Sequence, residues 1–140
     1  MKKLLNNNFK GIQHIGIPVT RIDYSKDFYQ RLGFESLMEK TFPKQGGNIT
    51  AVMMRRGNAV IELYQLPASE LGAIGNRTDG SIDHIAFSVT NIDAAFRELK
   101  ATGADIIEDS PVRLDFWENG CKYFAIRGPD GEKLEFNQIL

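Results

Sequence analysis

Two histidines and two glutamates are the residues of this 140-residue chain best suited to chemistry. His14 and His84 are its only histidines, and each lies in a run of residues with strand-like alternation. Glu62 and Glu135 each lie in a later short apolar run, at 60–63 and 133–136. A carboxylate is costly to bury in a strand unless it is paired or bound to a cation. Two imidazoles and two carboxylates offer four ligands to a divalent transition-metal ion, which leaves two octahedral positions for water or substrate.

The sequence around the two histidines is repeated. An ungapped alignment of residues 14–33 with residues 84–103 gives seven identities in twenty positions, the histidine among them. Most of these identities suit any strand–turn–helix unit, but a matched histidine does not follow from secondary structure. Such a repeat predicts a fold assembled from two similar units. The matched histidines, each followed by a glutamate, indicate a metal site made of two halves.

The elements around these residues follow from periodicity and turn signals. Asp23 and Asp93 suit helix N-caps, and the helices then run over 24–32 and from 93 to about 102, each ended by a glycine. In the first helix Tyr24, Phe28 and Leu32 share one stripe. Alternation predicts strands at 12–19, 35–41, 49–55, 59–65, 82–89, 105–108, 123–127 and 133–138, with turns at 46–47, 57–58 and 128–131.

The bulk properties predict one cytoplasmic domain over residues 1–140. It comprises a module at 10–66, a linker at 67–80 and a module at 81–139. A net charge of −1 argues against nucleic acid or an anionic membrane as a partner. Cys121 is the only cysteine, so no intramolecular disulfide forms, and we expect a packed or half-exposed thiol in a reducing compartment. The first eight residues lack the apolar region of a signal peptide.

Three segments resemble the vicinal oxygen chelate superfamily, the glyoxalase, bleomycin-resistance and extradiol dioxygenase group. They are His-Ile-Gly-Ile-Pro-Val at 14–19, Ser-Lys-Asp-Phe-Tyr-Gln-Arg-Leu-Gly-Phe at 25–34 and Gly-Pro-Asp-Gly-Glu-Lys-Leu-Glu-Phe at 128–136. The resemblance covers about residues 10–139. It implies an α+β fold of two tandem βαβββ modules with curved mixed sheets, and usually a homodimer. In such dimers a metal site often forms between modules of different subunits.

The order His, Glu, His, Glu is similar to that of bacterial glyoxalase I. The resemblance implies that His14, Glu62, His84 and Glu135 bind nickel, cobalt or zinc. It also implies a lyase or isomerase resembling lactoylglutathione lyase, in which the metal chelates vicinal oxygens of a small substrate. A proton then moves through an enediolate. Glu135 is the implied base, with Glu62 as the symmetric alternative.

The sequence departs from glyoxalase I where glutathione is held. Pro18, Leu66 and Gly80 stand where that family has an arginine, an asparagine and an arginine. A glutathione hemithioacetal is therefore a doubtful substrate. Arg55, Arg77, Arg113 and Lys122 could contact another anion, and the aromatic pair Phe116 and Trp117 could either cover the site or close the core.

Other activities of the same superfamily remain alternatives. A metal-dependent epimerase of the methylmalonyl-CoA type shares the enolate chemistry, although it usually has glutamine where Glu62 stands. A non-enzymatic drug-binding resistance protein keeps the fold without the metal, and the four intact ligands disfavour it. Ring-cleaving dioxygenases and fosfomycin-modifying transferases use three ligands, so the fourth argues against them.

Overall fold

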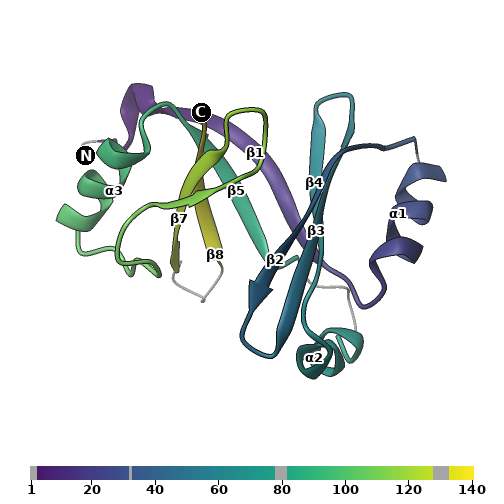
Figure 1. Cartoon of the computed structure of the whole chain (residues 1–140). Coiled ribbons are helices and arrows are strands. Elements are labelled where there is room, and N and C mark those ends of the chain that lie inside the picture. Colours follow the sequence, from purple (N-terminus) through teal and green to yellow (C-terminus); the bar gives the residue numbers. More distant parts are fainter. Residues whose placement is uncertain (1–2, 32, 78–81, 128–132) are drawn as a thin grey trace. The chain divides into compact units, whose positions relative to one another are not determined.

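The computed structural model of the chain describes residues 3–31, 33–77, 82–127 and 133–140 (Figure 1). By its internal contacts the chain divides into two compact units. We call His14–Asp83 the N-terminal unit, and Met1–Gln13 together with His84–Leu140 the C-terminal unit. Strand β1 (Phe9–Pro18) contributes its first residues to the C-terminal unit and its last ones to the N-terminal unit. The predicted modules at 10–66 and 81–139 within a single domain stay a prediction.

The N-terminal unit has the element order βαβββ. After β1 come α1 (Ile22–Arg31), β2 (Glu35–Lys44), β3 (Gly47–Arg56) and β4 (Ala59–Gln65). The strands lie in the order β2-β3-β4-β1, in which β1 and β4 are parallel and the other pairs are antiparallel. The first and last strands of the unit are therefore neighbours, although about forty residues separate them in the sequence.

The C-terminal unit repeats this order with β5 (His84–Val89), α3 (Ile92–Ala101), β6 (Val112–Leu114), β7 (Cys121–Arg127) and β8 (Lys133–Ile139). Its strands lie in the order β5-β8-β7-β6, with β5 and β8 parallel. The N-terminal residues pack here, after a short 3-10 helix, η1 (Asn6–Asn8). The Phe9 and Phe87 rings lie 5.2 Å apart. The predicted α+β fold of two βαβββ modules is confirmed.

One helix covers a face of the sheet in each unit, but the two helices are buried to different extents (Figure 1). Helix α3 buries Ile92, Ala95, Phe96 and Leu99 in a core that also holds Phe124. In the other unit, α1 buries only one of its own residues. No helix in the described part of the chain has the length and apolar character needed to cross a membrane.

The predicted stripe of α1 does not face the core. Tyr24 and Phe28 are 60% and 50% exposed, and Leu32 lies outside the described residues. Ile22 and Tyr29 turn toward the sheet instead, because their face of the helix meets Val52 and Leu63. The spacing of apolar residues identified the helix correctly, but the face that packs on the sheet carries Ile22 and Tyr29.

Helix α1 begins two residues before its predicted start and α3 begins one residue before, so Asp23 and Asp93 lie in first turns and are not caps. A glutamine from the last strand of each unit bonds the first helical N–H. Gln65 Oε1 accepts from Ile22 N at 2.8 Å, and Gln138 Oε1 accepts from Ile92 N at 2.8 Å. These bonds satisfy donors that a helix N-terminus otherwise leaves unpaired.

Two segments differ from their predictions, and a third lies outside the described residues. Residues 105–108 form no strand, because Ile106 makes only an isolated bridge to Ile126 and the Glu108 carboxylate accepts the Ala125 N–H at 2.7 Å. The predicted linker at 67–80 contains a 3-10 helix, η2 (Ala68–Glu70), and a short helix, α2 (Leu71–Gly75). The turn predicted at 128–131 lies outside the described residues.

We expect Gln138→Ala to lower the free energy of unfolding by about 0.5–2 kcal/mol, as for loss of a helix N-cap. The cause is the unpaired Ile92 N–H at the start of α3. Urea unfolding measures the change. Gln30→Ala, an exposed glutamine on α1, is the matched control and should stay within about 0.5 kcal/mol. Equal effects of the two substitutions would contradict a capping role for Gln138.

Candidate metal centre

In the N-terminal unit, β1 and β4 bring one histidine beside one glutamate. Gly16 is the register partner of Glu62, and His14 lies two residues earlier on the same face of β1. His14 Nε2 and Glu62 Oε2 are 3.5 Å apart. His14 is 2% exposed and the Glu62 side chain 13%. The glycine leaves room on this face, so the carboxylate can reach diagonally toward the imidazole.

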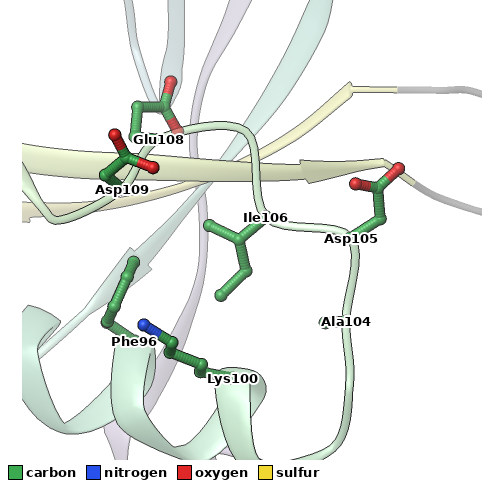
Figure 2. A pocket seen from close by; sticks show the side chains of 7 residues that line it. All are labelled: Phe96, Lys100, Ala104, Asp105, Ile106, Glu108 and Asp109. Carbon is green, nitrogen blue, oxygen red and sulfur yellow. The ribbon is translucent and has the colours of Figure 1, made fainter.

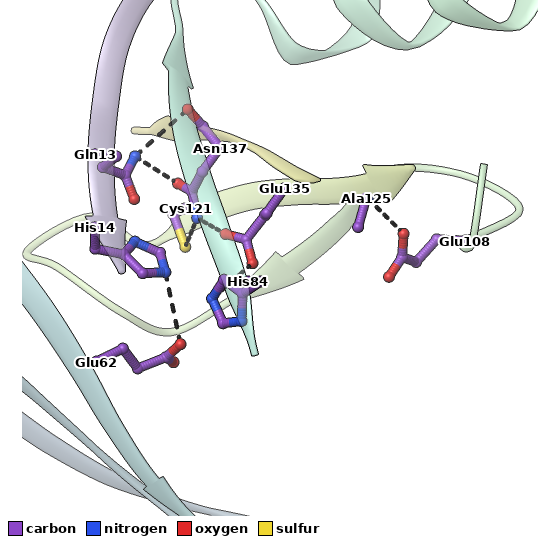
Figure 3. Close-up of polar contacts among 9 residues, drawn as sticks. All are labelled: Gln13, His14, Glu62, His84, Glu108, Cys121, Ala125, Glu135 and Asn137. Carbon is purple, nitrogen blue, oxygen red and sulfur yellow. Dashed lines mark hydrogen bonds and ion pairs between the residues drawn. The ribbon is translucent and has the colours of Figure 1, made fainter. Parts of the chain in front are cut away.

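The C-terminal unit contains the same arrangement. Ala86 is the register partner of Glu135, and His84 lies two residues before it on β5. His84 Nε2 and Glu135 Oε2 are 3.6 Å apart, with the side chains 8% and 12% exposed. Figure 3 shows both pairs, each joined by a dashed line. A small residue again stands opposite the glutamate. Within each unit, the structure therefore brings together the histidine and glutamate that the sequence predicted.

The separations within the pairs suit ligation better than hydrogen bonding. Good hydrogen bonds to nitrogen span about 2.7–3.2 Å, which is shorter than either pair. With metal–ligand bonds of about 2.1 Å, neighbouring ligand atoms lie about 3.0 Å apart in an octahedron and about 3.4 Å apart in a tetrahedron. Imidazole nitrogen and carboxylate oxygen are common ligands of nickel, cobalt and zinc. Each pair therefore fits a chelate of one divalent ion.

A buried amide supports the C-terminal pair. Asn137 Nδ2 lies 2.8 Å from Glu135 Oε1 and 3.8 Å from Cys121 Sγ. Its Oδ1 accepts from Gln13 Nε2 at 3.0 Å. Figure 3 shows these contacts, which link β1, β7 and β8 within the C-terminal unit. Cys121 is buried, as predicted for a packed thiol.

Tyr64 stands two residues after Glu62, as Asn137 stands two residues after Glu135. Burial raises the pKa of the Tyr64 phenol, and the negative charge of Asp83 and a hydrogen bond to that carboxylate raise it further. The phenol therefore stays protonated and donates to Asp83. Both units carry a histidine–glutamate pair, but the residue two positions after the glutamate differs. Tyr64 bonds Asp83, whereas Asn137 bonds Glu135 itself.

The other candidates from the sequence fall into structural roles or remain on the surface. Arg113 Nη2 donates to the Asn119 carbonyl at 3.0 Å, and Lys122 Nζ lies 3.8 Å from Asp93. Arg55 and Arg77 are exposed. These contacts tie Arg113 to its own loop and direct Lys122 toward the start of α3.

Phe116 and Trp117, the aromatic pair after β6, differ in their structural features. Phe116 is 2% exposed, which supports the prediction that it closes the core. Trp117 has a φ of 66°, a left-handed backbone conformation that is rare for an aromatic residue. Such strain persists only where surrounding structure enforces it, at a typical cost of about 1–3 kcal/mol.

A shallow hollow of about 300 Å³ lies in the C-terminal unit between α3 and the segment before β6. Its lining comprises Phe96, Lys100, Ala104, Asp105, Ile106, Glu108 and Asp109 (Figure 2). Neither histidine lines it. The Lys100 ammonium lies 5.5 Å from the centre of the Phe96 ring, and Glu108 is engaged by the Ala125 amide. The hollow is therefore separate from the histidine–glutamate pair.

Sequence reasoning missed the glutamines and the asparagine around the pairs. Each unit ends in Glu-x-x-Gln, at Glu62 with Gln65 and at Glu135 with Gln138. The glutamates face the histidines, whereas the glutamines reach the helix starts. This second repeat was visible in the sequence, whereas the N-cap of α3 is Asn91, whose Oδ1 accepts from Ala94 N at 2.9 Å. The bond from Gln13 to Asn137 spans 124 positions, and no local pattern announces it.

The fold and these pairs define a class of protein built from paired βαβββ units. The model of the glyoxalase/bleomycin resistance protein/dioxygenase superfamily matches residues 11–136. The chain belongs to this superfamily, as its sequence resemblance predicted.

Curated relatives and solved structures are similar to this chain over most of its length. The chain is 33% identical over 131 residues to the uncharacterized protein YwbC of Bacillus subtilis (strain 168), covering 92% of this chain and 98% of that protein. Methylmalonyl-CoA epimerase from Mycobacterium tuberculosis is similar in structure, with a TM-score of 0.77 and 22% identity, covering 100% of this chain and 93% of the other. A hypothetical protein from Bacillus halodurans C-125 gives a TM-score of 0.75 and 28% identity, covering 92% and 94%.

Ala86→Leu tests whether the space beside Glu135 matters. Ala86 is fully buried, and a larger side chain must enter the face that carries His84 and Glu135. We expect a loss of about 1–3 kcal/mol in the free energy of unfolding, from overpacking. Urea unfolding measures it. Ala101→Leu, an exposed position at the end of α3, is the control. A fully stable Ala86→Leu protein would show that this face has spare room.

Proposed function

We propose that the protein is a metal-dependent enzyme that moves a proton on a carbon next to a carbonyl group. The observation that carries the proposal is the recurrence of a buried histidine–glutamate pair at matched places in two βαβββ units. In both units the pair has the same register, and a small residue, Gly16 or Ala86, stands opposite the glutamate, which favours a functional pair over an incidental ion pair. Membership of a superfamily that includes many enzymes supports the same conclusion.

In this proposal His14, Glu62, His84 and Glu135 hold one divalent ion, with nickel, cobalt or zinc as the candidates. The four ligands come either from one chain or from two chains of a homodimer. When bound, such an ion polarises two neighbouring oxygens of the substrate and stabilises the negative charge that develops on them. Both histidines are buried, which suits ligands of an enclosed metal site.

The glutamates supply the proton chemistry. A carboxylate beside the substrate removes a proton from carbon and returns it to the same or the neighbouring carbon. Glu135 is our candidate for this base, and Glu62 is the symmetric alternative. Each is only partly exposed, so its carboxylate is screened from bulk water, which limits the loss of the proton to solvent.

Two substrate classes fit this chemistry. A glyoxalase I-like lyase acts on the hemithioacetal of a thiol, but Pro18, Leu66 and Gly80 replace the residues that would hold glutathione. An epimerase of the methylmalonyl-CoA type inverts the carbon next to a thioester. The structural likeness to methylmalonyl-CoA epimerases supports the second class, with Glu62 as its departure from the usual glutamine. We therefore propose thioester epimerisation ahead of hemithioacetal isomerisation.

The metal proposal is tested on protein purified without chelator and titrated with Co²⁺. We expect saturable binding, a visible d–d absorption spectrum and a rise in melting temperature, because a ligand of the folded state stabilises it. His84→Ala and His14→Ala each remove one ligand and should weaken binding by at least about 100-fold. Binding that is unchanged in both variants would rule out this site.

Glu135→Gln tests the base. The variant should still bind Co²⁺, since the amide oxygen can remain a ligand, and lose proton transfer by about 100- to 10,000-fold, because an amide cannot accept the proton. Exchange of the substrate's C–H proton in D₂O measures the step directly by NMR. Glu62→Gln is the matched variant. Full exchange by Glu135→Gln, together with loss in Glu62→Gln, would assign the base to Glu62.

The substrate class follows from the same exchange experiment. Methylmalonyl-CoA and the hemithioacetals of methylglyoxal with several thiols are offered in turn, and thioester absorbance follows the second group. We expect deuterium incorporation with methylmalonyl-CoA. Thioester formation from a hemithioacetal without epimerisation would reverse the proposed order of the two activities.

A further inference from the structure

Asn137 uses every hydrogen-bonding group of its side chain. It is 3% exposed and shares the face of β8 that carries Glu135. Its two N–H groups point to Glu135 Oε1 at 2.8 Å and to Cys121 Sγ at 3.8 Å. Its Oδ1 accepts from Gln13 Nε2. Its partners are two acceptors, on β8 and β7, and one donor, on β1, and together they fix both the position and the orientation of this amide.

The contact with Glu135 divides the roles of the two carboxylate oxygens. Oε1 is taken by Asn137, whereas Oε2 is the oxygen that lies 3.6 Å from His84 Nε2. The terminal torsion of a glutamate has a broad energy minimum, so the carboxylate plane rotates easily when nothing holds it. A bond to one oxygen from a rigid amide removes this freedom and leaves the other oxygen directed at the histidine (Figure 3).

A different residue type stands at the matching position of the N-terminal unit. The position that corresponds to Asn137 is Tyr64, and its hydroxyl donates to Asp83. The two glutamates therefore have the same register relative to their histidines. They differ in the contact made by the next residue on the same face, which is Tyr64 in one unit and Asn137 in the other. The difference lies within the strands β4 and β8 themselves, two residues beyond each carboxylate.

We propose that Asn137 is a positioning residue that holds Glu135 to a metal through Oε2 alone, and that Gln13 in turn holds Asn137. The inference rests on the proposed metal site and adds to it a specific support for one of the two glutamates. It also gives Cys121 a role as a buried acceptor for the second N–H of the amide.

Co²⁺ titration of the full chain tests this role. Asn137→Ala should weaken Co²⁺ binding by about 10- to 100-fold, as for other residues that orient a metal ligand, and should change the d–d spectrum because Glu135 can rotate. Gln138→Ala is the matched control on the neighbouring position of β8. It loses a bond to α3 and destabilises the fold, but it should leave Co²⁺ affinity and spectrum unchanged.

A double-mutant cycle separates positioning from general damage. In a Glu135→Ala background there is no carboxylate to orient, so adding Asn137→Ala should change Co²⁺ affinity by less than about 3-fold. Gln13→Ala gives a milder test at a half-buried position and should weaken binding by about 3- to 10-fold, because it loosens Asn137 without removing it. This variant keeps the test available if Asn137→Ala does not fold.

The outcomes are distinct. Unchanged affinity and spectrum in both Asn137→Ala and Gln13→Ala would overturn the positioning role, as would an equal loss with and without Glu135. Failure of the unmodified chain to bind Co²⁺ would overturn the metal site itself and this inference with it. That result is distinguishable from the first one, in which the unmodified chain binds Co²⁺ and the substitutions do not change its affinity.

Discussion

The parallel pairing of the first and last strands within each βαβββ unit is the constraint on which the site depends. In a parallel pair, a residue faces its register partner and approaches that partner's neighbours diagonally. Gly16 and Ala86 stand opposite the glutamates, and the histidines lie two residues earlier on the same face. A slip of one residue would turn the glutamate to the helix side of the sheet. The register therefore sets both the core and the chemistry.

In each unit, a bond between the last strand and the start of the helix also fixes that register. Gln65 and Gln138 are three residues beyond the glutamates and reach the first N–H of α1 and α3. The same strand thus presents a carboxylate to one face and an amide to the helix that covers the other. Sliding the strand would break the helix start and the histidine–glutamate pair together. This coupling is a physical reason for Glu-x-x-Gln to recur at the end of both units.

The sequence predicted those features that depend on local periodicity and on the repeat. The βαβββ order and the histidine–glutamate pairing within each unit followed from them. Three features did not. The buried face of α1 is chosen by contacts with Val52 and Leu63, which spacing along the helix does not reveal. Residues 105–108 lie beside β7, but the Glu108 side chain accepts the Ala125 N–H that a neighbouring strand would otherwise bond. Alternation therefore predicted a strand that does not form. The amide network of Asn137 depends on Gln13, far away in the sequence.

Divergence between the two units gives their two glutamates different surroundings, which bears on the proposed proton transfer. Two glutamates in identical surroundings would compete for the same role, whereas different surroundings allow the two carboxylates different roles in the proposed reaction. Glu135 has an amide on one oxygen, and the position that matches this amide in the other unit is a tyrosine committed to Asp83. With Asn137 on Oε1, the same oxygen of Glu135, Oε2, serves as the proposed metal ligand and as the proposed proton acceptor. The asymmetry therefore bears on the choice of base between Glu62 and Glu135, which the duplicated sequence around the histidines leaves even.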